Sequence, residues 1–247
     1  KPASAVFACG MTWIDLHRGP SRQMRRCISA DRKKHSKGYL KLLNSEGILM
    51  SDSRDYVAPS WDEIYDMLVN LAMRIKESGF KPDLIVGVSR GGWAPGRILS
   101  DLLANTHTAN IKIEFYVGIS KTARKPIVTQ PISEDISKKK ILVVDDVADT
   151  GESLLVALDH IRERSAGEVR TVTVYHKPHS RFKPDFFSET TSNWIVFPWE
   201  RLETTIFLIQ EAKAQGRSME SVRETLVKCR IDEKTVSALL QLANGGS

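Results

Sequence analysis

Between about residues 60 and 200, the pattern of apolar and polar positions alternates between two kinds of segment. The capping-box form S-W-D-E begins at Ser60, and the apolar residues after it recur at intervals of three and four until Gly79 and Pro82, which predicts a helix. Residues 83–88 are then almost wholly apolar and rich in β-branched side chains. Such a run is typical of a strand that is buried on both faces of a parallel sheet.

The same alternation continues along the chain. Further helices are predicted at residues 94–103 and 152–164, and further strands at residues 111–119, 141–144, 169–175 and 195–197. Residues 120–140 are polar, contain Pro126 and Pro131 and show no period, so we expect a long loop there. The alternation predicts an α/β domain with a mainly parallel sheet, in which ligands bind beyond the carboxyl ends of the strands.

The two ends of the chain differ from this central region. After Glu200 the pattern predicts three short helices, at residues 202–214, 219–229 and 232–242. Acidic and basic residues alternate along the last two without forming a basic face, which disfavours a helix-turn-helix that reads DNA. We therefore expect three regions: a disordered or non-native extension over residues 1–49, the α/β domain over residues 50–200, and a helical extension over residues 201–247.

The net charge of +6 lies in the first of these regions. Residues 1–49 hold ten Lys or Arg against three Asp or Glu, whereas the rest of the chain holds 26 basic and 27 acidic residues. A basic tail can bind nucleic acid non-specifically, but a solvated tail is the simpler interpretation, and Met50 is an equally good candidate for the true start. Scattered cysteines and the lack of a secretory signal or long apolar run favour a soluble, cytoplasmic protein without a nucleic-acid or membrane partner.

Candidate chemistry is concentrated in V-V-D-D-V-A-D-T-G-E-S-L, residues 143–154, where a strand passes into a helix. Carboxylates near a helix start are ordinary, because the helix dipole favours negative charge there. The same helix start can also bind an anion. Gly151 permits a tight turn, and the hydroxyl groups of Thr150 and Ser153 join the free N–H groups in a cradle for a monophosphate.

The adjacent carboxylates Asp145 and Asp146 need a different role. They can accept hydrogen bonds from vicinal hydroxyl groups or hold Mg²⁺, which is usually shared with phosphate oxygens. A ribose 5-phosphate offers both a diol and a phosphate, so the acidic loop is well explained by a phosphorylated sugar.

Residues 143–154 closely resemble the signature with which type I phosphoribosyltransferases bind 5-phosphoribosyl 1-pyrophosphate (PRPP): apolar residues, two acidic residues, two variable residues and D-T-G-x-[ST]. The resemblance implies that Asp146 and Asp145 hold Mg²⁺ and that Asp149 contacts purine N7 and takes its proton, as the catalytic residue. The PRPP-binding turn would consist of Asp145, Asp146, Val147, Ala148, Asp149, Thr150, Gly151, Glu152 and Ser153.

Three further segments are similar to bacterial xanthine-guanine phosphoribosyltransferase. The S-R-G-G run resembles its pyrophosphate loop, which implies that Arg90, Gly91 and Gly92 hold the leaving group. H-K-P resembles the segment whose lysine contacts the exocyclic oxygen of the purine, and N-W-I-V-F-P-W-E resembles the segment whose aromatic ring stacks on the base. Lys177, Trp194 and Ile195 would therefore bind the purine, with Lys177 favouring 6-oxopurines because an ammonium group can only donate.

The resemblance covers about residues 60–200 and implies a purine phosphoribosyltransferase of the type I fold. PRPP would bind with Mg²⁺, pyrophosphate would leave from C1 of the ribose, and purine N9 would attack that carbon. The reaction would serve purine salvage, and the enzyme would be a homodimer or higher homo-oligomer. Residues 120–140 would form the mobile hood loop that closes over the site. Lys121, Arg124 and Lys125 are its candidate phosphate contacts.

Two alternatives remain open from the sequence. The C-terminal helices could reshape the base pocket, so that the enzyme uses adenine on the same scaffold. The chain could instead be a non-catalytic regulator that senses PRPP and binds nucleic acid, because fold does not decide function. A generic phosphate-binding hydrolase has little support, since G-x-S-x-G and G-x-x-x-x-G-K-[ST] motifs are both lacking.

Overall fold

The computed structural model describes residues 55–117 and 124–245. The predictions for residues 1–49 and for Met50 and Lys121 lie outside these ranges. Six strands form one sheet in the order β4-β3-β2-β5-β6-β7, and every neighbouring pair is parallel except β3 and β4. These strands are β2 (Leu84–Ser89), β3 (Thr108–Val117), β4 (Arg124–Gln130), β5 (Ile141–Ala148), β6 (Val169–His176) and β7 (Phe186–Thr190). The predicted α/β class with a mainly parallel sheet is confirmed.

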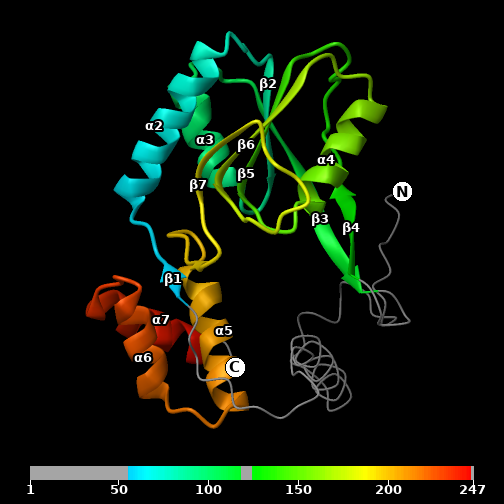
Figure 1. The fold of residues 1–247 in the computed structure, drawn as a ribbon. Helices are drawn as coiled ribbons and strands as arrows, with labels where there is room; N and C mark the ends of the chain where they lie inside the picture. Colours follow the sequence, from blue (N-terminus) through cyan, green and yellow to red (C-terminus); the bar gives the residue numbers. More distant parts are fainter. Residues whose placement is uncertain (1–54, 118–123, 246–247) are drawn as a thin grey trace, which may run out of the picture. The chain divides into compact units, whose positions relative to one another are not determined.

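Helices cover both faces of this sheet (Figure 1), namely α2 (Trp61–Glu77) and α3 (Trp93–Leu102) on one face and α4 (Glu152–Glu163) on the other. The pleat of β5 divides its side chains between the two cores. Leu142 and Val144 pack with α2 and α3, whereas Ile141 and Val143 pack with α4, as the period of two requires. This double burial explains why the central strands are continuous apolar runs.

The helix predicted after Ser60 forms with its predicted cap. The Ser60 hydroxyl accepts a hydrogen bond from the Glu63 amide at 3.1 Å, and the Glu63 carboxylate accepts one from the Ser60 amide at 2.7 Å. These two bonds satisfy N–H groups that a helix start otherwise leaves without partners. The apolar stripe of α2, including Ile64 and Leu68, is fully buried against the sheet.

Two predictions about the sheet are wrong. Residues 124–130 belong to β4, an antiparallel partner of β3, and not to a structureless loop. As an edge strand, β4 needs a neighbour on one side only and tolerates Pro126, which hides its strand character in the sequence. The main sheet ends at β7, which the sequence analysis missed. The segment expected to end it forms β8 (Trp194–Ile195), which pairs in parallel with β1 (Tyr56–Val57).

Helices α5 (Arg201–Ala214), α6 (Met219–Lys228) and α7 (Glu233–Gly245) correspond to the three helices predicted after Glu200. They share a third apolar core, which includes Val196 from the segment that follows β8. Cys229 lies in this core as a free, buried thiol. Among the described residues, none of the helices has the length and apolar character needed to cross a membrane.

Among the glycines of the described residues, Gly92 leaves the least room for a side chain beside neighbouring backbone. A methyl group there would lie 2.2 Å from the Val144 carbonyl oxygen and 2.6 Å from the Val88 amide nitrogen. We expect Gly92→Ala to lower the free energy of unfolding by about 1–3 kcal/mol, because two backbone segments must move apart. Gly96→Ala is the matched control, since its new methyl group would make ordinary contacts at 3.9 Å. Urea unfolding of both variants measures the difference, and equal stabilities would contradict the prediction.

Candidate functional site

Two adjacent carboxylates lie buried at the carboxyl end of β5. Asp145 and Asp146 are each 8 % exposed. Asp145 Oδ1 accepts a hydrogen bond from the Asp146 amide at 3.0 Å, and Asp146 Oδ1 accepts one from the Val147 amide at 2.7 Å. The Trp199 indole N–H donates to Asp146 Oδ2 at 3.4 Å. These three donors are uncharged, so they do not neutralise a pair of carboxylates that share one largely buried position.

The electrostatics of this pair follow from its burial. Burial, and then repulsion from Asp146, raises the pKa of the Asp145 carboxyl well above its ordinary value. Burial also raises the pKa of Asp146 to about 6, although the hydrogen bonds from Trp199 and Val147 oppose the change. Nearby, burial and the charge of Asp146 raise the pKa of Glu200 to about 7. The site therefore favours any ligand that brings a cation.

The turn from β2 into α3 lies directly against this pair. A methyl group at Gly91 would come within 2.3 Å of Asp146 Oδ2, so only glycine allows the turn to approach so closely. The peptide bond between Ser89 and Arg90 is cis. Arg90 forms an ion pair with Glu203 of α5. The predicted pyrophosphate loop and the acidic pair are thus brought together.

A cavity of about 630 Å³ joins these groups. Its lining includes Arg90, Gly91, Asp145, Asp146, Ser153, Trp199, Glu200 and Glu203. The described residues contain no group of three or more His, Cys, Asp or Glu side chains arranged to hold a metal ion. Asp145 and Asp146 fit Mg²⁺ only as two oxygen donors that share the ion with oxygens of a ligand.

The phosphate turn follows β5 and opens α4. Gly151 has a φ of +82°, in the left-handed region, and no side chain caps the start of α4. The Thr150 hydroxyl accepts a hydrogen bond from the Glu152 amide at 3.3 Å. The turn packs against the segment after β6. The Arg181 amide donates to the Thr150 carbonyl at 3.0 Å, and a methyl group at Gly151 would lie 2.7 Å from Phe182 Cβ. Thr150 therefore already occupies one N–H group of the predicted anion cradle, that of Glu152, whereas the N-cap residue Gly151 has no side chain to occupy another.

Three residues of the predicted turn have side chains that do not line the candidate cavity, namely Val147, Ala148 and Glu152. The side chain of Ala148 is buried in the core beside α4, and that of Val147 packs on the opposite core. Glu152 lies 3.7 Å from the guanidinium group of Arg181. Any contact of Val147 or Ala148 with a ligand would have to come from their main chain.

The predicted purine residues gather beside this turn. Lys177 is buried, and its ammonium group donates to the Asn193 carbonyl. Burial lowers the pKa of Lys177, while the nearby Asp149 carboxylate opposes that change. Asp149 is exposed, and its Oδ1 lies 3.0 Å from His179 Nε2. Asp149 and Lys177 thus lie close enough to contact one small molecule.

Trp194 and Ile195 point to opposite sides of β8. Trp194 is 44 % exposed and stacks on Phe207 of α5, with 5.3 Å between ring centroids and 6° between ring planes. The Ile195 side chain is buried in the core, so it is not a contact surface for a base. The amides of Trp194 and Val196 donate to β1, so the main chain of Ile195 faces away from that strand.

Sequence reasoning missed four neighbours of these residues, namely His179, Glu200, Glu203 and Phe207. The signals were present: H-K-P-H puts a second histidine two residues beyond Lys177, and positions 200, 203 and 207 share one face at helical spacing. Their partners lie far away in the sequence, so only the fold identifies the contacts.

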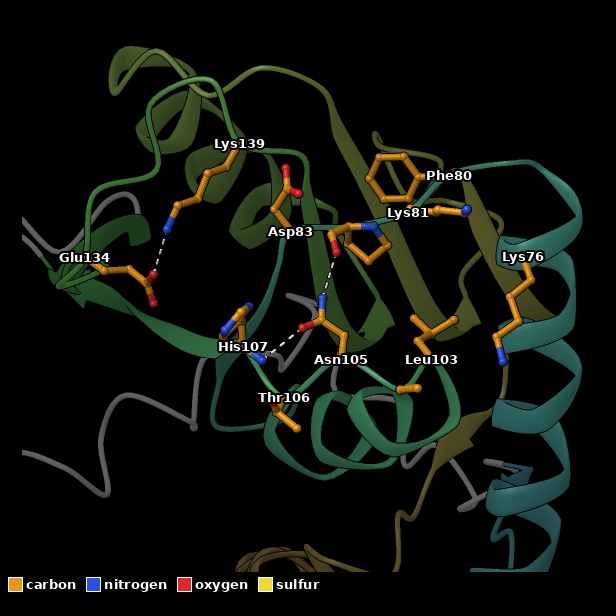
Figure 2. Close-up of a pocket in the computed structure, with 12 residues that line it drawn as sticks. Lys76, Phe80, Lys81, Asp83, Leu103, Asn105, Thr106, His107, Glu134 and Lys139 are labelled. Carbon is orange, nitrogen blue, oxygen red and sulfur yellow. Dashed lines mark hydrogen bonds and ion pairs between the residues drawn. The ribbon is translucent and has the colours of Figure 1, made fainter.

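A larger cavity, of about 980 Å³, lies elsewhere (Figure 2). Its lining comes from the segments that precede β2, β3 and β5, and therefore from the amino ends of those strands. Figure 2 shows that its polar groups bind one another: Lys139 pairs with Glu134 at 2.9 Å, and the Asn105 amide group donates to the Pro82 carbonyl at 2.7 Å. None of the predicted site residues lines it, so size does not identify the functional site here.

Known proteins resemble this chain over the same region. A family model described as the phosphoribosyl transferase domain matches residues 60–204. The chain is 27 % identical to a hypoxanthine-guanine phosphoribosyltransferase of Schizosaccharomyces pombe over 57 % of this chain and 87 % of that protein. It is 25 % identical to a xanthine-guanine phosphoribosyltransferase of Gluconobacter oxydans over 59 % of this chain and 84 % of that protein. A solved purine phosphoribosyltransferase of Pyrococcus horikoshii is 36 % identical, with a TM-score of 0.54 and coverage of 59 % and 93 %.

The buried acidic pair makes a prediction about stability. Without metal or ligand, Asp146→Asn removes a charge that burial disfavours, so we expect it to raise the free energy of unfolding at pH 8 by roughly 1–3 kcal/mol. The folded-state pKa of about 6 exceeds the ordinary value of 3.8, so the gain is largest above pH 6 and disappears as the pH falls and Asp146 takes up a proton.

Thermal unfolding in chelator at pH 8 and at pH 5 measures this effect. Asp159→Asn is the matched control, because its side chain is 69 % exposed and its charge is already solvated. A loss of stability at pH 8 in the Asp146 variant would contradict the electrostatic account.

Proposed function

The chain belongs to the phosphoribosyltransferase family, and from this membership we propose that it is a Mg²⁺-dependent purine phosphoribosyltransferase. It would transfer the 5-phosphoribosyl group of PRPP to N9 of a 6-oxopurine, in purine salvage. The names of its relatives support the class of base, since they include hypoxanthine, guanine and xanthine enzymes. The observation that carries the proposal is the cavity in which the Gly91 turn lies on the buried Asp145–Asp146 pair.

PRPP would occupy this cavity and the adjoining turn. The start of α4 with Thr150 and Ser153 suits the 5-phosphate, because helix N–H groups beyond that of Glu152, and the two hydroxyl groups, can donate to an anion. Asp145 and Asp146 suit the ribose hydroxyl groups and the metal. Bound Mg²⁺ would neutralise charge on the pyrophosphate and on the acidic pair together.

The leaving pyrophosphate would bind to the turn after β2. The guanidinium group of Arg90 and the N–H group of Gly91 can donate to its oxygens as the bond from C1 to oxygen breaks. The Gly92 N–H already donates to the Val88 carbonyl at 2.8 Å, so Gly92 serves the turn by lacking a side chain. The ion pair between Arg90 and Glu203 uses one N–H of Nη2, and the guanidinium group has four further N–H donors. Arg90 can therefore bind an anion without leaving Glu203.

The base would lie beside Asp149, Lys177 and Trp194. Lys177 has three N–H donors and gives one to the Asn193 carbonyl, which leaves donors for the exocyclic oxygen of a 6-oxopurine. Trp194 offers a flat surface, and stacking on an aromatic ring stabilises a bound base by about 1–3 kcal/mol. As N9 bonds to C1, the proton on N7 would pass to the Asp149 carboxylate, so that charge and protons balance.

An assay of each base separates the proposed function from its alternatives. We expect PRPP with Mg²⁺ to be consumed with hypoxanthine, guanine or xanthine, followed by ultraviolet absorbance, and adenine to be the poorest substrate because Lys177 cannot accept a hydrogen bond from its amino group. Turnover of adenine alone would overturn the role of Lys177. Salt-sensitive nucleic-acid binding without any turnover would favour the regulator instead.

Asp149→Asn tests the proton acceptor. The amide cannot take the N7 proton, so we expect kcat to fall about 10²- to 10⁴-fold while the affinity for PRPP, measured by calorimetry, changes little. Glu163→Gln at the far end of α4 is the matched control and should keep full activity. Unchanged turnover of the Asp149 variant would remove this residue from the mechanism.

A further inference from the structure

One face of α5 borders both halves of the site. Glu203 contacts Arg90 of the pyrophosphate turn, and Phe207, one helical turn further on, stacks on Trp194. Residues four positions apart lie on the same side of a helix, so the two contacts describe a single face. Helix α5 belongs to the C-terminal helices, whose contribution to the site the sequence left open.

Trp194 needs support from outside its own strand. Strand β8 has only two residues and pairs only with the equally short β1. The Trp194 amide is fixed by its hydrogen bond to the Asp55 carbonyl at 3.1 Å, but that bond does not fix the indole plane. The nearly parallel ring of Phe207, 5.3 Å away, restrains that plane.

Phe207 is itself well anchored. Its side chain packs against the core that α5, α6 and α7 share, which includes Leu208 and Val222. A base that displaced Phe207 would have to expose part of this apolar core to water, which costs free energy. Trp194 is 44 % exposed with Phe207 stacked on it, so a base can stack on the indole without moving Phe207.

We propose that Phe207 is a positioning residue for the purine: it holds the indole of Trp194 so that phenyl ring, indole and base form a stack of three rings. The inference rests on the proposed function and adds to it a residue outside the family's PRPP signature. Preorganisation of this kind strengthens binding because the indole loses less conformational freedom when the base arrives. Phe207 would affect the base without affecting PRPP, since it does not line the cavity beside Asp145 and Asp146.

The test compares Phe207→Ala with Phe207→Tyr and with Ile206→Ala. Ile206 is the neighbouring α5 residue, is 37 % exposed and serves as the matched control. We expect Phe207→Ala to raise KM for the best purine about five- to tenfold and to leave KM for PRPP within twofold. Phe207→Tyr keeps the flat ring, so its KM for the purine should equal the wild-type value. Ile206→Ala should also leave KM for the purine unchanged. Phe207→Leu keeps apolar volume in case the alanine variant does not fold, and it should also raise KM for the purine.

A second measurement does not depend on turnover. Titration of the base into the protein should quench tryptophan fluorescence, and the Kd from this titration should rise with KM in the Phe207 variants. An unchanged KM and Kd in Phe207→Ala or Phe207→Leu would overturn the inference, as would tighter purine binding, which would place Phe207 in the position of the base. If the wild-type chain neither turns over nor binds any of the four bases, the proposed function fails first. If the wild type is active and the variants match it, only the role of Phe207 fails.

Discussion

The burial of two adjacent carboxylates at the end of β5 is the constraint around which the site is organised. Asp145 and Asp146 lie on a central strand, between β2 and β6, and each is only 8 % exposed although both line the candidate-site cavity. Main-chain amides and one indole N–H are their described hydrogen-bond donors, and none of these carries a positive charge. The fold therefore holds an electrostatic cost that a bound cation would relieve, and it accepts lower stability where function requires charge.

The same constraint fixes the neighbouring backbone. Gly91 must lack a side chain to pass over Asp146, and Gly92 must lack one to pass between β2 and β5. Trp199 must reach back from the segment before α5 to donate its N–H. Three parts of the sequence that are separated by more than fifty residues thus meet at one carboxylate. The way these three segments meet identifies the candidate site better than the volume of either described cavity does.

The fold could be predicted where packing constrains an element along its whole length. Strand Leu84–Ser89 is buried on both faces and α2 along one stripe, and the apolar pattern of each records that burial. Strand β5 was predicted to end at Val144 but continues to Ala148. The prediction stopped early because two adjacent aspartates are more typical of a loop than of a strand. Edge strands β4 and β7 pack on fewer neighbours, so their sequences carry a weaker signal.

The candidate site could be predicted only where its residues are neighbours in the sequence. Residues 145–153 are contiguous, so one motif contains both the chemistry and the spacing. Glu203 and Phe207 reach the predicted site residues Arg90 and Trp194 only because α5 folds back beside them, and no local pattern encodes that return. The basic residues of the predicted hood loop illustrate the opposite limit: Lys125 lies in β4, and Lys121 lies outside the described residues.

The close approach of Phe182 to Gly151, where an added methyl group would lie 2.7 Å from Phe182 Cβ, links the turn before α4 to the segment after β6. The turn expected to hold a phosphate rests on the segment that carries Lys177, and the Arg181 amide joins the two by a hydrogen bond to Thr150. The turn at Thr150 and Gly151 and the segment after β6 therefore form one continuous edge, which we call the rim. Under the proposed function, a substitution in this rim that altered the contact of Lys177 with the base would also disturb the turn expected to hold the phosphate. New specificity is more accessible from Trp194 and α5, which lie outside it.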